Sequence, residues 1–370
     1  MDNESRRTDL KTMTLPVRQR SDAPVFVLGS PRSGTTLLYD MLLSAGGFAV
    51  YLAEANVFNL LVPRFGDFAV RANREKMLQT WLHSKLFRAT GLDAQLVRQR
   101  VLDECCNGAD FLRIIMGEIC RAQGMKRWAE NSPEGMLYLP TIKRLIPDAL
   151  FVHIIRDGRD VATSLGKLRY IRSFPWEERH GLLGCGIYWE WIISQGREFG
   201  RSVPADYMEI HFEDLIARPQ PTLDRVASFI DQPLDYELIQ RVAYGSLTKP
   251  NTSFRQESKA DFNPVGRWKK SFTPEQLLRF ERLVGKTLRD AGYETATNGP
   301  ELGLDLSLRS TRLLHRSYFA GKVLFKNNSL VRALRPVISG PELDGIVLAE
   351  DHPPVVKRTA PNPLGIQSGT

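Results

Sequence analysis

The segment best suited to chemistry is a run of glycine, hydroxyl and arginine residues near the N-terminus, Gly29-Ser30-Pro31-Arg32-Ser33-Gly34-Thr35-Thr36. Arg32 carries a permanent charge and several N–H donors, and the serine and threonine side chains add hydroxyl donors. Where such a loop enters a helix, unpaired backbone N–H groups and the positive end of the helix dipole also face an anion. The segment therefore predicts an anion-binding loop built from Arg32, Ser33, Gly34, Thr35 and Thr36.

The spacing of the two glycines is that of a nucleotide-binding P-loop, but one residue differs. In P-loop proteins a lysine directly follows the second glycine and contacts the phosphates. Thr35 stands at that position, so the main phosphate-binding charge of a kinase or GTPase is missing, and Arg32 supplies a cation from inside the loop instead. A P-loop kinase or NTPase stays as an alternative function.

A second cationic segment surrounds Arg156, which ends a predicted buried strand. Ligands of open α/β sheets bind at this end of the strands. Ser164 follows eight residues later, about two helical turns along the next helix, so an arginine and a hydroxyl could hold one phosphate group. The competing interpretation is that Arg156-Asp157 and Arg159-Asp160 are surface ion pairs.

Both segments need strands and helices to hold them at one edge of a sheet. The apolar runs 25–28 and 150–155 predict buried strands, and apolar residues at helical spacing predict helices at 35–44 and about 159–167. Further predicted elements are a strand at 207–212 and helices at 182–199, 221–230 and 274–291. This alternation predicts an α/β fold with a P-loop-like parallel sheet and helices on both faces.

The first loop resembles the phosphosulfate loop of the sulfotransferase family, which reads P-[Lys/Arg]-Ser-Gly-Thr-[Thr/Ser] and matches residues 31–36 completely. The resemblance implies that this loop binds the 5′-phosphosulfate of 3′-phosphoadenylyl sulfate (PAPS), with Arg32 nearest the sulfuryl group. The family's R-D-G-R segment, with a serine eight residues after its first arginine, is matched by Arg156 and Ser164 and implies a site for the 3′-phosphate. The match is closest to the branch with arginine in the loop, which includes many bacterial enzymes and the tyrosylprotein type.

A later segment, Gly266-Arg267-Trp268-Lys269-Lys270-Ser271-Phe272-Thr273, resembles the family's G-x-W-K-x-x-F-T cap over the donor. The resemblance implies that Arg267, Trp268 and Lys269 contact the donor, with Arg255 as a further candidate. In the cytosolic branch an R-K-G triplet precedes this cap, whereas this chain has Asp261-Phe262-Asn263. Which side chains complete the 3′-phosphate site stays open, and Trp268 could equally be a core residue.

An acceptor hydroxyl needs a general base. In the arginine-loop branch the general base is a glutamate that follows the loop at about the same separation as Glu54, so the resemblance implies Glu54 as the base. In the cytosolic branch the base is a histidine, which makes His83 the rival candidate. Residues 126–133 resemble the family's K-x-W-x-[Glu/Asp]-K-[Thr/Ser]-P segment, whose second lysine reaches the reacting group. This chain has the uncharged Asn131 there, so either Lys126 compensates or the electrophile is weaker.

The resemblance implies an enzyme that moves a sulfuryl group from PAPS to a hydroxyl or amine by in-line displacement. Arg32 and the loop amides would stabilise the charge on the leaving phosphate. No metal is expected. The acceptor could be a small molecule, a lipid, a glycan or a carrier-bound group, because fold alone does not specify it. The missing triplet and Asn131 keep a non-catalytic nucleotide-binding module on the same fold as a second alternative.

Charge indicates which partners to expect. The 370 residues carry a net charge of +8, which favours anionic partners. The segment 309–335 holds seven Arg/Lys, no acid and several apolar residues. It could bind an acidic partner, a glycan or a membrane, although a packed helix with a solvated basic face is the favoured interpretation. No motif suggests nucleic-acid binding, and a homo-oligomer stays open.

The regions of the chain differ in composition. We expect a flexible N-terminal arm at 1–22, a sulfotransferase domain at 23–295, a basic helical extension at 296–340 and a disordered Pro-rich tail at 341–370. The four cysteines form no C-x-x-C pair and are expected to be reduced and mostly packed. The polar N-terminus shows no signal peptide, and no apolar stretch is long enough to span a membrane, so a cytoplasmic location is expected.

Overall fold

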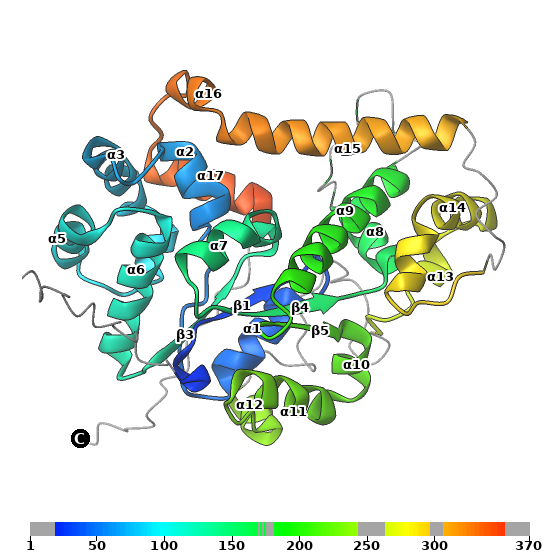
Figure 1. The fold of residues 1–370 in the computed structure, drawn as a ribbon, viewed down its shortest axis with the longest axis horizontal. Helices are drawn as coiled ribbons and strands as arrows, with labels where there is room; N and C mark the ends of the chain where they lie inside the picture. Colours follow the sequence, from blue (N-terminus) through cyan, green and yellow to red (C-terminus); the bar gives the residue numbers. More distant parts are fainter. Residues whose placement is uncertain are drawn as a thin grey trace, which may run out of the picture.

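The computed structural model describes residues 19–168, 171, 174, 181–242, 263–296 and 306–351. Its centre is a five-stranded sheet with the strand order β2-β3-β1-β4-β5 (Figure 1). The strands are β1 (Val25–Leu28), β2 (Phe48–Ala49), β3 (Arg127–Asn131), β4 (Leu150–Ile155) and β5 (Tyr207–His211). All neighbouring strands are parallel, so their carboxyl ends meet at one edge, the carboxyl edge, and their amino ends at the other, the amino edge.

The central strands β1 and β4 are buried along their whole length, which explains why each is a continuous apolar run. Their side chains alternate between the two faces of the sheet. Phe26 and Phe151 pack into one apolar cluster, and Val25 and Val152 pack into a second cluster on the opposite face. The strands predicted at 25–28 and 150–155 are therefore confirmed.

Helices cover both faces of the sheet, which confirms the predicted α/β architecture (Figure 1). The helices α1 (Thr35–Ser44), α11 (Pro219–Ile230) and α12 (Tyr236–Val242) supply one layer. The opposite layer contains α6 (Gly108–Gln123), α7 (Leu139–Leu145), α8 (Gly158–Lys167), α9 (Gly181–Ser202) and α14 (Pro274–Asp290).

Shorter elements connect or extend these layers. Between β2 and α6 lie a π-helix η2 (Val57–Leu61), α2 (Val62–Phe65), α3 (Arg71–Trp81), α4 (Lys85–Arg88) and α5 (Ala94–Glu104). The remaining connecting elements are η1 (Arg20–Asp22), η3 (Pro133–Tyr138), α10 (Phe212–Ala217) and α13 (Trp268–Ser271).

The strands β2 and β3 were not predicted from the sequence. β3 is buried at four of its five residues, although Arg127, Glu130 and Asn131 are polar. Hydrogen bonds make this burial tolerable: the guanidinium of Arg127 donates to the carbonyl oxygens of Ala23 (2.6 Å) and Ile230 (2.9 Å). An apolar pattern cannot reveal a strand whose burial depends on partners distant in sequence.

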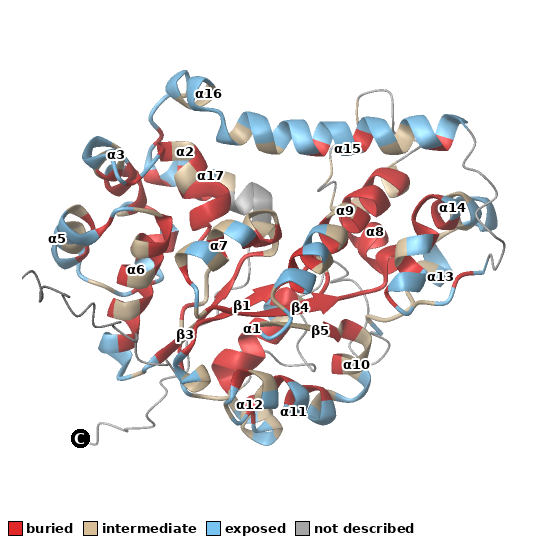
Figure 2. Cartoon of the chain, viewed as in Figure 1, coloured by how far each residue is buried: buried red, intermediate tan, exposed pale blue. Residues whose placement is uncertain are grey.

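The C-terminal extension is helical and packs on the domain. The helix α15 (Leu306–Asn327) runs across one end of the molecule, and α16 (Ser329–Ala333) and α17 (Gly340–Asp351) follow it (Figure 1). Phe319 of α15 stacks on Trp191 of α9 with 5.6 Å between the ring centroids. Most of α15 is nevertheless exposed, as Figure 2 shows.

Two boundary predictions need correction. The tail predicted to be disordered from residue 341 begins with α17, which packs on α3 and α4 because Leu343 is fully buried and Asp344 Oδ1 accepts a 2.7 Å hydrogen bond from the Lys85 amide. The predicted N-terminal arm ends in η1, whose Arg20 carbonyl accepts a hydrogen bond from Arg127 Nη2. Both segments are held by contacts with residues distant in sequence, which a local pattern does not reveal.

Two further properties concern the described residues only. No helix among them is long and apolar enough to cross a membrane. The four cysteines are free thiols, three of them buried and Cys106 exposed.

Candidate active site

The anion-binding loop predicted at 29–36 lies at the carboxyl edge, between β1 and α1. Gly34 caps α1 with φ +94°, and a Cβ added there would lie 2.4 Å from the ring of Phe212. A Cβ on Gly29 would lie 2.6 Å from the carbonyl oxygen of Ile154. Glycine is therefore required at both positions, because the loop backbone packs directly against β4 and α10.

Within this loop Arg32 adopts φ +72°, a left-handed conformation that is uncommon for residues with a side chain. Ser33 and Thr35 are buried, and Thr36 is exposed at the start of α1. The Ser33 hydroxyl has no hydrogen-bond partner among the described residues. A buried hydroxyl beside a helix N-terminus is available to an anionic ligand.

The two predicted cationic segments meet. The guanidinium of Arg156, at the end of β4, donates from Nη1 to the carbonyl oxygen of Arg32 (2.9 Å) and from Nη2 to that of Pro264 (2.5 Å). Arg32 Nε in turn donates to Ser164 Oγ on α8 (3.0 Å). Arg32, Arg156 and Ser164 therefore belong to one connected network at the carboxyl edge.

Arg156 is a deeply buried cation with unusual surroundings. Its pKa is lowered, mainly by burial and to a smaller extent by the nearby charge of Arg267. The carboxylates of Asp160 and Glu213 partly offset this effect by raising the pKa. Its Nε has no hydrogen-bond partner within the described ranges. The pair Arg156 and Arg267 thus concentrates positive charge at a site where a phosphate would be favoured.

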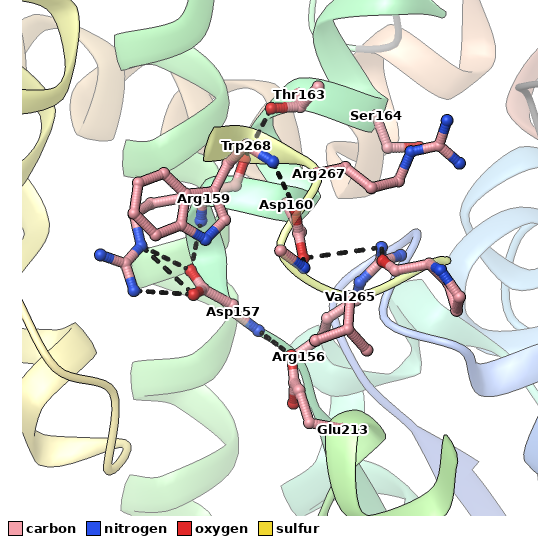
Figure 3. A network of polar contacts seen from close by, with 12 residues as sticks. Arg156, Asp157, Arg159, Asp160, Thr163, Ser164, Glu213, Val265, Arg267 and Trp268 are labelled. Carbon is pink, nitrogen blue, oxygen red and sulfur yellow. Dashed lines mark hydrogen bonds and ion pairs between the residues drawn. The ribbon is translucent and has the colours of Figure 1, made fainter. Parts of the chain in front are cut away.

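The residues after Arg156 are not surface ion pairs, which corrects that alternative. Asp157, Arg159 and Asp160 are all buried. Asp157 Oδ1 caps α8 by accepting from the Arg159 amide (2.9 Å), and the Arg159 guanidinium donates to both carboxylate oxygens of Asp157 (Figure 3). The same guanidinium donates to Glu281 Oε1 (2.8 Å). These contacts fix the start of α8, which carries Ser164.

Asp160 connects α8 to the late segment 266–273. Its Oδ2 accepts from the Gly266 amide and its Oδ1 from the Trp268 amide, both at 2.8 Å (Figure 3). Trp268 is half-buried and covers the Arg159 guanidinium, whose carbon lies 4.0 Å from the centroid of the indole ring. The segment is therefore docked over the network, with Arg267 close to Arg156.

The remaining candidates for the 3′-phosphate site have different positions. Lys269 is exposed on α13, and its ammonium lies 5.8 Å from the centroid of the Trp268 ring. Arg255 and the first two residues of the segment 261–263 lie outside the described residues. Of the late residues, Arg267 is thus the cation that the structure brings to Arg156.

Glu54 lies in the segment after β2, at the same carboxyl edge. It is half-buried. Burial is the main cause that raises the pKa of Tyr39 on α1, followed by the charge of Glu130, and the charge of Glu54 adds a smaller contribution. The Tyr39 hydroxyl donates to the Tyr51 carbonyl oxygen (2.6 Å), which ties this segment to the helix that follows the loop. The structure thus brings Glu54 to the edge that carries Arg32.

The rival base has a different environment. His83 is exposed on the turn between α3 and α4, and its Nδ1 lies 2.8 Å from the Gln79 carbonyl oxygen. A Cβ on Gly340 would lie 2.5 Å from the His83 carbonyl carbon, so the turn is covered by the start of α17. His83 therefore lies against the C-terminal extension.

Glu130, on β3, was missed by sequence reasoning. It is 5% exposed, burial raises its pKa to about 8, and the Ala55 amide is hydrogen-bonded to its carboxyl group. Glu130 thus positions the segment that carries Glu54. The sequence signal that could have identified Glu130 is the acidic position of the family motif matched by residues 126–133.

The neighbouring positions of β3 decide the question of the missing lysine. Asn131 is buried at the carboxyl end of the strand, and its Oδ1 has no partner in the described part of the chain. Lys126 is exposed and precedes the strand at the amino edge. Because four residues of extended strand lie between the two, Lys126 does not compensate for the amide, and that alternative is wrong.

In the regions that the structure describes, no group of three or more His, Cys, Asp or Glu side chains could hold a metal ion.

Comparisons with known proteins agree on one family. Residues 24–236 match the sulfotransferase family. A putative protein-tyrosine sulfotransferase of Caenorhabditis briggsae is 22% identical over 76% of this chain and 92% of its own, and protein-tyrosine sulfotransferase 1 of Danio rerio is 24% identical over 83% of each chain. The solved sulfotransferase domain from the curacin biosynthetic pathway has a TM-score of 0.50 and 18% identity, covering 73% of this chain and 98% of that domain, which supports the fold.

Proposed function

Since this chain belongs to the sulfotransferase family and is a sulfotransferase, we propose that it transfers a sulfuryl group from PAPS to a hydroxyl or amine of an acceptor. The observation that carries the proposal is the network that joins Arg32, Ser164 and Arg156 at the carboxyl edge. A donor with phosphate groups at both its 5′ and 3′ positions needs two cationic sites within the reach of one molecule.

The residues present fit such a donor. The loop 29–36 would hold the 5′-phosphosulfate, because it combines Arg32, the buried Ser33 hydroxyl and the N-terminus of α1. Arg156, Ser164 and Arg267 would hold the 3′-phosphate. In support, Arg156 keeps a buried Nε without a partner in the described chain, and Asp160 fixes the segment that carries Arg267.

PAPS would supply the sulfuryl group, and the chain would supply charge and a base. In the displacement, the bond from the acceptor oxygen or nitrogen to sulfur forms, and the bond from sulfur to the bridging phosphate oxygen breaks. Arg32 and the loop amides would stabilise the negative charge that remains on the leaving phosphate. The Glu54 carboxylate would take the proton of the acceptor.

Asn131 would act on the acceptor side of the same edge. As an amide it can donate a hydrogen bond through Nδ2 without adding charge. Its position at the end of β3, between the strands that precede Glu54 and Arg32, supports this assignment. We expect Asn131→Lys to restore the electrophile typical of the family and to raise the rate of sulfuryl transfer.

Calorimetric titration tests the donor. We expect adenosine 3′,5′-bisphosphate to bind more tightly than ATP with Mg²⁺, and Arg156→Ala to weaken the bisphosphate far more than adenosine 5′-monophosphate. The matched control is Arg218→Ala, because Arg218 is an exposed arginine paired with Asp214 on α10. Tighter binding of ATP with Mg²⁺ would favour a P-loop NTPase instead, and donor binding without turnover on any acceptor would favour a non-catalytic module.

A further inference from the structure

The C-terminal helices expose most of the large apolar side chains at the surface of the described chain. Twelve such side chains are exposed, and nine of them belong to residues 306–337. We call these nine residues the apolar strip: Leu306, Leu313, Leu314, Tyr318, Leu324, Phe325, Leu330, Leu334 and Val337. Scattered exposed apolar residues are ordinary, but their concentration in one segment, formed by α15, α16 and the residues that follow α16, marks an interaction surface.

Apart from Tyr318, whose ring contacts that of Phe174, the apolar strip is not the face by which α15 packs on the domain. That face contains Phe319, which is buried against Trp191 and Tyr188 of α9. Leu313 and Leu324 are 69% and 73% exposed and lie eleven residues apart, about three helical turns, so they share one outward line. The helix therefore has two apolar faces, and the domain covers only one of them.

Positive charge borders the apolar strip. The segment 309–335 holds seven Arg/Lys and no acid. On α15, Arg309 and Lys322 are exposed, and Arg316 is 44% exposed at its side chain although it pairs with Glu190. An amphipathic helix with apolar side chains and flanking cations is typical of helices that lie on an anionic lipid surface.

A cationic cavity adjoins this surface where α16 meets α2 and α3. Its volume is about 270 Å³, and its lining includes Arg64, Lys76, Arg332 and Arg335 as well as Val337 of the apolar strip. Burial and the charge of Arg335 lower the pKa of Arg64, although Glu342 partly offsets this effect. Four cations around one concavity favour a bound phosphate group.

We propose that α15, α16 and this cavity form the surface by which the protein binds an anionic lipid membrane. The apolar strip enters the boundary between head groups and acyl chains, and the four cations of the cavity bind the phosphate of one lipid head group. Electrostatic attraction and apolar burial then act on the same face of the molecule.

The features of the surface favour a membrane over other partners. Leu313 and Leu324 project outward along a helix of 22 residues, about 33 Å in length, which suits a soft and flat partner. A second copy of this chain on a two-fold axis would bring two basic faces together, and their repulsion would oppose the contact. A membrane satisfies both the charges and the apolar side chains.

Flotation of the full-length protein with lipid vesicles tests the proposal. We expect binding to vesicles of phosphatidylcholine with phosphatidylglycerol and little binding to phosphatidylcholine alone. Leu313→Ser with Leu324→Ser should weaken binding about tenfold, since two apolar side chains no longer enter the lipid. The matched control is Leu96→Ser with Leu278→Ser, two leucines that are 42% and 37% exposed outside the strip; it should bind as the wild type does.

A second pair of variants tests the cavity. Arg332→Gln with Arg335→Gln should remove the preference for anionic vesicles. Soluble glycerol 3-phosphate should reduce vesicle binding of the wild-type protein but not of this double variant. Binding of adenosine 3′,5′-bisphosphate should be unchanged in every variant, which shows that the fold is intact. Equal binding to both kinds of vesicle, or unchanged binding after loss of both leucines, would overturn the proposal. The proposal would also be overturned if light scattering showed that the wild-type protein is a dimer and the leucine variant a monomer, because the apolar strip would then be a contact between copies.

Discussion

Two buried arginines lie at opposite edges of the same sheet, and they have different kinds of partners. Arg127 begins β3 at the amino edge and is 2% exposed. Its three guanidinium nitrogens donate to the carbonyl oxygens of Ala23, Ile230 and Arg20. Burial lowers its pKa to about 10, but these backbone acceptors satisfy its donors and join the N-terminal segment to the core.

Arg156 follows β4 at the carboxyl edge and is buried nearly as deeply. It donates to the carbonyl oxygens of Arg32 and Pro264, both in segments that belong to the candidate site, while its Nε has no partner in the ranges described. Arg267 adds a second positive charge nearby. Burial of a cation therefore does not by itself indicate a functional site, and neither does a neighbouring cation, because Arg20 lies near Arg127 as well. What distinguishes Arg156 is its unsatisfied donor and its contacts with two segments of the candidate site.

The largest effect should come from the carboxyl edge. We expect Arg32→Ala to lower kcat/KM about 10³-fold, because charge on the leaving phosphate loses its main cationic partner. The melting temperature should change little, since Arg32 is only half-buried. Steady-state assays with labelled donor measure the effect beside Arg218→Ala. If Arg32→Ala kept full turnover, the contrast between the two edges would have no catalytic meaning.

The amino edge should respond in stability instead. Arg127→Ala should lower the free energy of unfolding by about 3 kcal/mol, because buried carbonyl oxygens lose their donors. Chemical denaturation measures this loss, and the folded fraction should bind adenosine 3′,5′-bisphosphate with unchanged affinity. A variant of normal stability but weakened nucleotide binding would contradict the structural role given to Arg127.

The next prediction distinguishes the two candidate bases, Glu54 at the carboxyl edge and His83. Glu54→Gln should lower kcat about 10²-fold while the affinity for adenosine 3′,5′-bisphosphate stays constant, because the amide keeps the shape of the side chain but cannot accept a proton. His83→Gln serves as the control and should leave kcat unchanged. The reverse pattern would make His83 the base.

The smallest effect concerns Glu130, which titrates inside the fold. Its folded pKa of about 8 is above the ordinary value of 4.5, so its contribution to stability is complete below about pH 4.5 and is lost as the pH rises through 8. Glu130→Gln should therefore be more stable than the wild type at pH 8 by roughly 2 kcal/mol and nearly equal to it at pH 4.5. Thermal unfolding across this range measures the difference, and identical pH profiles would show that Glu130 is not buried as a carboxyl group.

The sequence alone determined the parts of the site whose signal is local. The loop at 31–36, the strands at 25–28 and 150–155 and the helix at 35–44 follow from contiguous patterns, and the structure has the same bounds. Short-range patterns suffice there because a buried strand must be apolar and a tight anion-binding turn must contain glycine. The family resemblance, confirmed by the comparisons, rests on these same residues.

Only the tertiary structure decided what depends on distant partners. It placed Arg156 against Arg32, docked the segment of Arg267 through Asp160, and put Lys126 at the wrong edge to replace a missing lysine. It also revealed β3 and Glu130. The physical reason is that polar residues can be buried only where hydrogen-bond partners meet them, and folding, not proximity along the chain, brings those partners together.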